Sequence, residues 1–301
     1  MRISTLLFNE RISNEILNRQ SEMAETQLQL STGRQILRPS DDPISSKQAL
    51  DVQKFLDTTN QYQKNIDIVR GRLELEETVL AESMDVLQRL NELALQANTD
   101  TYTATDKGLI AEEVDQLLGE LVAIANTRDS NDEYLFSGFQ RETKPIVDAG
   151  GGVYQYQGDQ GQRLIHIAAD RKVADAETGF EAFMDIPASG GGTNNLFSMV
   201  YDLAANMRAD ADLAADIDNI RNALDNVTQV RTKAGARLAS TEQQEGVNED
   251  FILHFEMELS SLQDLDYAEA ITRFNRQTTA LQAAQQSYVQ IQGLSLFDYI
   301  R

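Results

Sequence analysis

Apolar residues recur every three or four positions along much of this chain, the spacing that one face of a helix requires. The strongest stripe runs between residues 66 and 97, where eight of ten heptad positions are apolar. Its positions are Ile66, Val69, Leu73, Glu76, Leu80, Ser83, Leu87, Leu90, Ala94 and Ala97. A second stripe predicts a helix over residues 106–128, and a third set starts at Leu196 and continues beyond Leu238, with an irregularity expected at Glu245 and Gly246.

The two ends of the chain carry weaker stripes. Five of nine heptad positions between residues 9 and 37 are apolar, and so are five of eight between residues 267 and 292. Each end presents a single apolar stripe, so we expect the two ends to pack against each other. Because these stripes can bury little apolar surface within one chain, we also expect the ends to become ordered only when neighbouring copies supply additional apolar surface.

The pattern changes between about residues 134 and 192. VYQYQ and RLIHIA alternate, and glycine runs and prolines interrupt the helical spacing. This predicts a small β insertion. The predicted fold is therefore mainly α: an elongated antiparallel helical bundle or coiled coil formed by the N- and C-terminal regions, with a small inserted β domain.

A break separates the first stripe from the second, in the segment RPSDDPISSKQAL at 38–50. Proline disfavours a helical residue before it, so we expect Pro39 to end the first helix. Asp42 is a suitable N-cap, Pro43 suits the first helical position, and Asp41 is favoured by the helix dipole. We interpret these four residues as a hinge rather than as a catalytic acidic pair.

Charge and composition exclude several classes of protein. A net charge of −22 disfavours nucleic acid as a partner, and the absence of cysteine removes disulfides and thiolate chemistry. The ends are nearly neutral, with five Arg against four acids in 1–40 and three of each in 266–301, which suits contact with other chains. The opening MRISTLLFNE is too short in apolar residues for a signal peptide, so any export would use another route.

No reactive constellation stands out. His254 and Glu258 lie four apart on a predicted helix, but the other histidine, His166, falls in the β region, where it reads as an exposed strand residue. The triple glycines lack the spacing of a phosphate loop. We therefore expect no enzyme activity, no catalytic residues, no metal and no cofactor.

Several motifs resemble those of the bacterial flagellin family. LQLSTGRQILRPSDDP at 28–43 is similar to the family's N-terminal signature. ELVAIANTRDSNDEYLFSGF at 120–139 and DLDYAEAITRFNRQTTALQAAQQSYVQIQGLSLFDYI at 264–300 resemble two further helical regions. Phe136-Ser137-Gly138 and the run from Pro43 to Ala49 resemble the hook-filament junction members of the family more than filament-forming flagellins.

The resemblance implies a structural subunit that joins the hook, through the first hook-associated protein, to the flagellin filament. The implied partners are further copies of the chain in a ring, that hook-associated protein, flagellin, an export chaperone and the type III export apparatus. The subunit would be exported unfolded and lie at the junction, outside the cell, with no membrane insertion. A filament-forming flagellin is the alternative, and a coiled-coil scaffold unrelated to flagella is a third.

The resemblance also implies a division into layers. Residues 1–40 and 262–301 would form an inner tube, 41–145 and 193–261 a helical bundle, and 146–192 an outer β-rich domain. The expected assembly interface consists of apolar residues of the two ends: Ile3, Leu6, Leu7, Ile12, Ile16, Met23, Leu30, Tyr267, Ile271, Phe274, Leu281, Tyr288, Ile291, Leu294, Leu296 and Phe297. The hinge, or spoke, would consist of Pro39, Asp41, Asp42 and Pro43.

Overall fold

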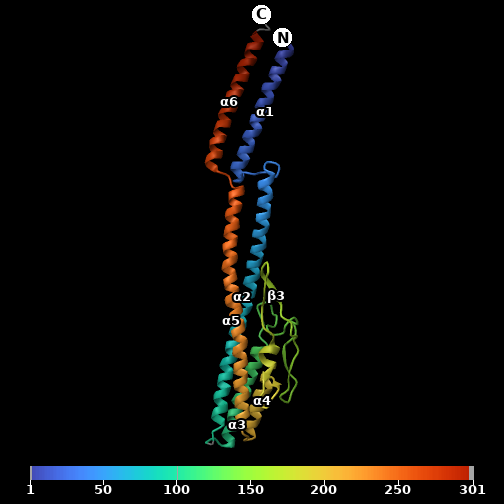
Figure 1. Cartoon of the computed structure of the whole chain (residues 1–301), viewed down its shortest axis with the longest axis vertical. Helices are drawn as coiled ribbons and strands as arrows, with labels where there is room; N and C mark the ends of the chain where they lie inside the picture. The colour runs from blue at the N-terminus through green and yellow to red at the C-terminus, as the bar shows by residue number, and fades with distance from the viewer. Residues whose placement is uncertain (1, 100, 298–301) are drawn as a thin grey trace. The chain divides into compact units, whose positions relative to one another are not determined.

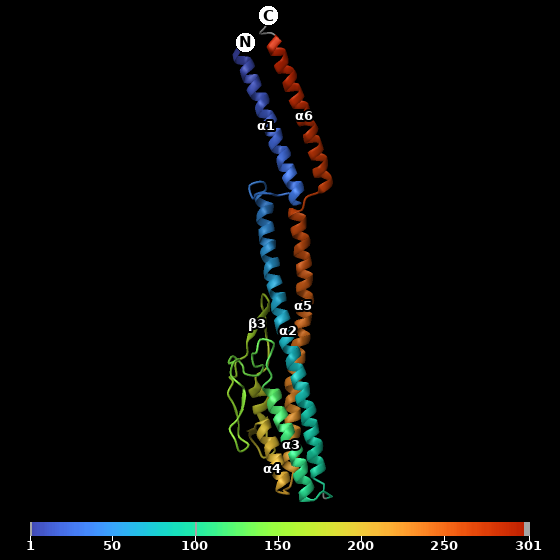
Figure 2. The same cartoon turned by 180° about the vertical axis from the view of Figure 1, so that it is seen from behind.

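The computed structural model describes residues 2–99 and 101–297, which form two compact units. Unit 1 comprises Met1–Thr58 and Phe251–Arg301, and unit 2 comprises Thr59–Asp250. Six long helices and three pairs of short strands make up the described chain (Figures 1 and 2). The helices are α1 Arg2–Thr32, α2 Pro43–Ala97, α3 Ala104–Ala125, α4 Leu196–Arg208, α5 Ala214–Gln263 and α6 Tyr267–Phe297. The mainly α fold with a small β insertion is as predicted.

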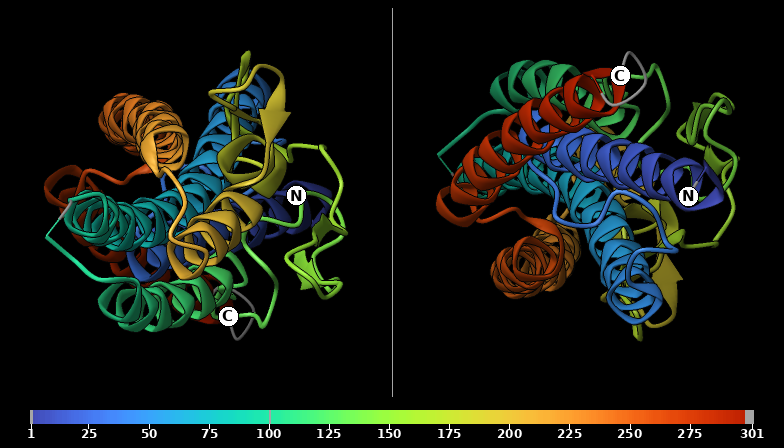
Figure 3. Two further views of the ribbon diagram at one scale, coloured as in Figure 1. Left: turned by 90° about the horizontal axis from the view of Figure 1, so that it is seen from below. Right: turned by 90° about the horizontal axis from the view of Figure 1, so that it is seen from above.

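The helices of unit 2 enclose a large apolar cluster, and a smaller one lies under the second hairpin. Figure 3 shows the helices seen end-on. All ten heptad positions that the sequence singles out between residues 66 and 97 are buried. Two of them are polar. Ser83 donates to the carbonyl of Val79 at 2.9 Å, and Glu76 Oε1 accepts from the backbone amide of Glu177 at 2.9 Å, whereas Glu76 Oε2 is buried without a hydrogen-bond partner among the described residues.

The β insertion consists of three antiparallel hairpins. β1 Ile146–Asp148 pairs with β2 Tyr154–Tyr156, β3 Leu164–Ala168 with β4 Arg171–Ala174, and β5 Ile186–Pro187 with β6 Thr193–Asn194. A π-helical turn, η1 Phe180–Met184, lies between the second and third hairpins. Two-stranded ribbons are marginal in water on their own, so they need a helical surface beneath them.

The second hairpin obtains that surface from α2. Ile167 and Val173 pack on Ile66, Val69 and Leu73, and the hairpin lies beside α2 in both side views (Figures 1 and 2). Helix side chains also reach the edge of β3. Asn65 donates to the carbonyl of His166 at 2.7 Å, and Asn248 of α5 donates to that of Ile167 at 3.0 Å.

A buried ionic cluster ties the β insertion to α2. Arg72 lies within ion-pair distance of Asp129 and Asp175, and all three side chains are almost fully buried. Asp175 also pairs with Arg141 at 3.2 Å and with Arg163 at 2.5 Å. Buried charges of this kind are tolerated only when they are paired, so the cluster holds the insertion in one position.

Unit 1 contains the antiparallel pair α1 and α6, with the start of α1 and the end of α6 at the same end of the pair (Figure 1). The expected packing of the two ends is therefore found. The start of α2 and the end of α5 complete the unit. No helix in the described part of the chain is long and apolar enough to cross a membrane.

Two expectations about helix boundaries are wrong. α1 ends at Thr32 rather than at Pro39, because Gly33 has φ +70, the left-handed conformation that terminates helices and that glycine adopts without strain. α5 continues through Glu245 and Gly246 without irregularity, since Thr241 and Asn248 are buried on either side and hold the helix in place.

Candidate assembly interface

The inner face of α1 follows the predicted stripe. Its side chains at 12, 16, 19, 23, 26 and 30 are buried or half-buried, whereas all their immediate neighbours except residue 29 are exposed. Met23 Sδ accepts from Thr278 Oγ1 of α6 at 3.8 Å. The α1 stripe is therefore used inside the chain to hold α6.

α6 meets α1 on a face that is rotated relative to the prediction. Phe274, Thr278, Leu281 and Tyr288 are buried or half-buried as the stripe requires, but positions 271 and 285 are exposed, whereas 270, 277 and 284 are buried or half-buried. Ala270 is fully buried, and Ile271 remains 49% exposed. The smaller residue is therefore the buried one at this point of α6, and the larger Ile271 lies outward.

The predicted interface residues thus fall into distinct groups. Leu7, Tyr267 and Ile271 are exposed, and Leu281 is buried. Half-buried are Ile12, Ile16, Met23, Leu30, Phe274 and Tyr288. The side chains of Ile3, Leu6, Ile291, Leu294, Leu296 and Phe297 lie outside the described ones. Contact of any of these with another copy stays a prediction.

Further exposed apolar side chains lie elsewhere in unit 1, at positions the heptad analysis does not single out. Ile44 and Leu50 at the start of α2 are 73% and 70% exposed, and Leu253 and Met257 of α5 are 58% and 64% exposed. Phe55 of α2 stacks on Phe255 with a centroid distance of 5.9 Å. The sequence signal for these residues is only that they are large, apolar and outside the stripe.

The two carboxylates of the hinge, Asp41 and Asp42, accept hydrogen bonds from the backbone of two different turns. Asp42 Oδ1 accepts from the amides of Ile44 and Ser45, each at 3.1 Å, and its other oxygen accepts from Ser45 Oγ at 2.6 Å. These bonds lower the pKa of Asp42 and make it the N-cap of α2, with Pro43 as the first helical residue, as predicted. Asp41 instead accepts from the amide of Arg38 at 2.8 Å, closing the turn that contains Pro39.

The two linkers of unit 1 hold each other by backbone hydrogen bonds. The amide of Leu265 donates to the carbonyl of Gly33 at 3.0 Å, and that of Gln35 donates to the carbonyl of Gln263 at 2.8 Å. The chain leaving α1 and the chain entering α6 are therefore joined where both helices meet the linkers. A displacement of one linker must move or break its pairing with the other.

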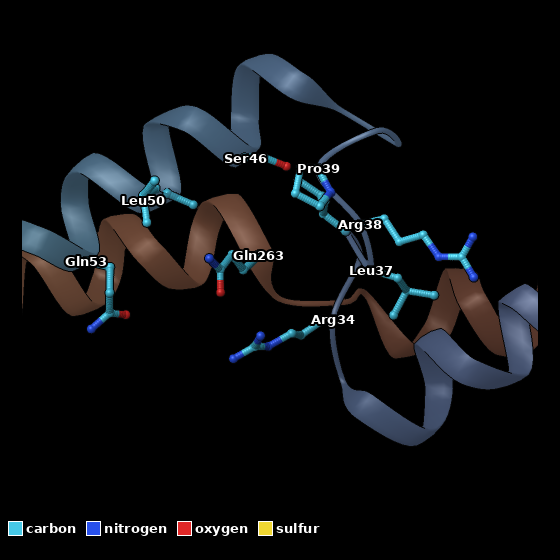
Figure 4. A pocket seen from close by; sticks show the side chains of 10 residues that line it. Arg34, Leu37, Arg38, Pro39, Ser46, Leu50, Gln53 and Gln263 are labelled. Atoms are coloured by element: carbon cyan, nitrogen blue, oxygen red, sulfur yellow. The ribbon is translucent and has the colours of Figure 1, made fainter.

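A cavity of about 340 Å³ lies beside this pairing, between the 34–39 linker, the first turns of α2 and the end of α5 (Figure 4). We call it the linker cavity. It is lined by Arg34, Ile36, Leu37, Arg38, Pro39, Ser46, Ala49, Leu50, Gln53 and Gln263. Its lining mixes apolar side chains with amide, hydroxyl and guanidinium donors.

The described residues hold no group of three or more His, Asp or Glu side chains that could bind a metal ion. His166 is exposed, as predicted, and His254 lies beside the ring of Phe255. Burial raises the pKa of Glu76 to about 7, but this side chain lies in the core of unit 2, where its carboxylate meets Glu177 rather than a cleft.

Comparison with known proteins agrees with this helical fold. The bacterial flagellin N-terminal helical region matches residues 3–141, and the bacterial flagellin C-terminal helical region matches residues 217–300. Flagellar hook-associated protein 3 of Escherichia coli is 30% identical over 99% of this chain and 99% of its own length. A flagellin of Clostridium tyrobutyricum is 31% identical, but the match spans 49% of this chain and 39% of that flagellin.

A solved structure shows the same fold. The crystal structure of flagellar hook-associated protein 3 from Legionella pneumophila matches with a TM-score of 0.66 and 21% identity, covering 70% of this chain and 98% of that one. At this level of identity the likeness concerns the fold alone. The hook-associated protein matches over its whole length, whereas the flagellin matches over less than half of its own.

Proposed function

This chain belongs to the bacterial flagellin family and, within it, to the group of flagellar hook-associated protein 3, and from that premise we propose that it is a structural subunit of the hook-filament junction. The observation that carries the proposal is the match over the full length of a hook-associated protein 3. A filament-forming flagellin is the alternative. The match to a flagellin over 39% of its length favours the junction subunit.

The proposed partners are other copies of the chain in a ring, the first hook-associated protein on the hook side and flagellin on the filament side. An export chaperone and the type III export apparatus would deliver the unfolded chain, and the assembled subunit would lie outside the cell at the junction. Unit 1 supports self-assembly, because Leu7, Tyr267 and Ile271 present apolar surface that nothing in the described chain covers. We propose no catalytic activity.

We also propose that the chain is arranged in layers in the assembly. Residues 1–40 and 262–301 would form the inner tube, 41–145 and 193–261 the surrounding bundle, and 146–192 the outer domain. The paired linkers, at residues 33–35 and 263–265, lie close in sequence to the boundary between the residues of the proposed inner tube and those of the proposed bundle. Pro39, Asp41, Asp42 and Pro43 would act there as the hinge.

Deletion of the gene tests the function. We expect the deletion strain to keep its hooks, to lose its filaments and to release unpolymerised flagellin into the medium, and we expect the wild-type gene to restore filaments. Electron microscopy of the cells and immunoblotting of the medium provide the measurement. Loss of the major filament subunit itself would identify the chain as a flagellin and contradict the proposal.

A further inference from the structure

Arginines are paired very differently in the two units. In unit 2 each arginine bonds through its guanidinium to a described side chain, usually a carboxylate. In the described part of unit 1, Arg11, Arg34, Arg38, Arg273 and Arg276 form no ion pair. The chain as a whole has 48 acidic and 26 basic residues, so carboxylates are abundant. These guanidinium groups are available to carboxylates outside the chain.

Arg34 is the arginine whose surroundings form a built site. Its guanidinium lies on the same side of the linker as the side chains of Gln53 and Gln263, whereas the Arg38 guanidinium extends in the opposite direction (Figure 4). The hydroxyl of Ser46 is buried in the lining without a hydrogen-bond partner among the described residues. A buried hydroxyl left unpaired costs stability, so its presence here points to a group that is supplied on binding.

The linker cavity combines these donors with apolar walls. Ala49 is fully buried in the wall, and Leu50 is 70% exposed at its edge. Guanidinium groups bind carboxylates with two parallel hydrogen bonds, and side-chain amides add further donors. An acidic side chain with an aliphatic stem suits such a cavity better than an inorganic anion does.

We propose that the linker cavity receives an acidic side chain of a second copy of this chain. Charge complementarity selects that occupant: residues 59–250 carry 34 acidic against 16 basic residues, and arginines there are already paired. The surplus carboxylates of one copy therefore complement the unpaired Arg34 of the next. Since the cavity walls include the paired linkers, its occupation stabilises the hinge in the assembled state.

The inference rests on the proposed function, and charge reversal tests it by complementation. Arg34→Glu should fail to restore filaments to the deletion strain, because it sets two carboxylates against each other. Arg276→Glu is the matched control: it makes the same change of charge in the same unit, on an exposed side chain of α6 that does not line the cavity, and it should restore filaments. Unchanged helix content and thermal midpoint in circular dichroism would show that both variants fold.

The outcomes separate the two proposals. If the wild-type gene itself fails to restore filaments, the proposed function is wrong. If the wild-type gene succeeds and Arg34→Glu succeeds equally, only the cavity proposal is overturned. Failure of both Arg34→Glu and Arg276→Glu would overturn it as well, since the effect would then follow net charge rather than the cavity.

Photo-cross-linking identifies the occupant. A benzoylphenylalanine at Gln53, in a chain produced beside the wild-type chain so that flagella form, should give an adduct of twice the chain's mass in isolated flagella. Mass spectrometry should assign the captured peptide to a second copy and to a segment containing Asp or Glu. Capture of another protein alone, or no adduct, would overturn the proposal.

Discussion

The properties of single side chains in this protein depend on their burial and backbone conformation as well as on their residue type. Glu76 occupies a heptad position that would ordinarily hold an apolar residue, and it is fully buried. Its pKa rises to about 7, chiefly because burial disfavours the charged form, while the nearby Glu177 and Asp175 raise it further and Arg237 and the Glu177 amide oppose the rise. Burial raises the pKa of Glu177 as well.

The raised pKa of Glu76 predicts a pH dependence of stability. The folded chain keeps this proton above pH 4.5, where the unfolded chain releases it, so the free energy of unfolding should fall as the pH rises from about 4.5 to about 7. Glu76→Gln keeps the acceptor for the Glu177 amide and carries no charge. Relative to the wild type, it should be more stable by about 1–3 kcal/mol at pH 8 and show a flatter pH profile.

Urea unfolding at several pH values measures this effect. Glu74→Gln is the control, because Glu74 is an exposed carboxylate two residues away on the same helix. Equal pH profiles for the Glu76 and Glu74 variants would contradict the prediction.

Two glycines of the described helical regions should respond oppositely to alanine. At Gly33, φ is +70, and an added Cβ would lie 2.8 Å from Tyr267 Oη, so Gly33→Ala should destabilise the chain by about 1–2 kcal/mol. At Gly246, nothing lies within 4 Å of the added Cβ, and Gly246→Ala should stabilise α5 by about 0.5–1 kcal/mol. Urea midpoints of the two variants test this, and shifts in the same direction would refute it.

At the scale of elements, helix ends define the linkers of unit 1. Gly33 ends α1, Asp42 starts α2, and the linker between them pairs with residues that precede α6. Pro39 occupies the second position of the turn from Arg38 to Asp41, which its restricted φ favours. The hinge is therefore an ordered turn with its own hydrogen bonds.

Replacement of both hinge prolines should separate folding from assembly. Pro39→Ala with Pro43→Ala frees the linker backbone but leaves the core of unit 2 unchanged, since neither residue belongs to it. We expect a thermal midpoint close to that of the wild type, with impaired filament attachment in the complemented deletion strain. Normal filament attachment by this double variant would count against a hinge role.

At the scale of the whole molecule, the two units differ in how fully they bury their side chains. Unit 2 contains the continuous apolar core, whereas α1 and α6 of unit 1 share a seam of mostly half-buried residues. A helix held by little buried surface opens more readily, and its amides then exchange with solvent. In the free subunit, the backbone amides of unit 2 should therefore be better protected from exchange with solvent than those of α1 and α6.

Hydrogen exchange of the free subunit tests this expectation. Amides of α1 and α6 should exchange much faster than those of α3, and they should become protected in isolated flagella. Equal protection of the three helices in the free subunit would contradict the idea that the ends order on assembly.

The sequence by itself determined the features that depend on local spacing. The α2 stripe, the α3 helix, the β insertion and the Asp42-Pro43 helix start follow from side-chain periodicity and capping, which act over a few residues. Resemblance of short motifs also indicated the family. For each of these structural features, the physical cause acts between residues a few positions apart in the chain.

Only the tertiary structure decided the features that depend on contacts distant in sequence. Ala270 rather than Ile271 is the buried residue at the start of α6. The pairing of residues 33–35 with 263–265, the Arg72 cluster and the linker cavity with Arg34 join segments far apart in the chain. A residue's periodicity shows which face it occupies, but not which segment that face will meet.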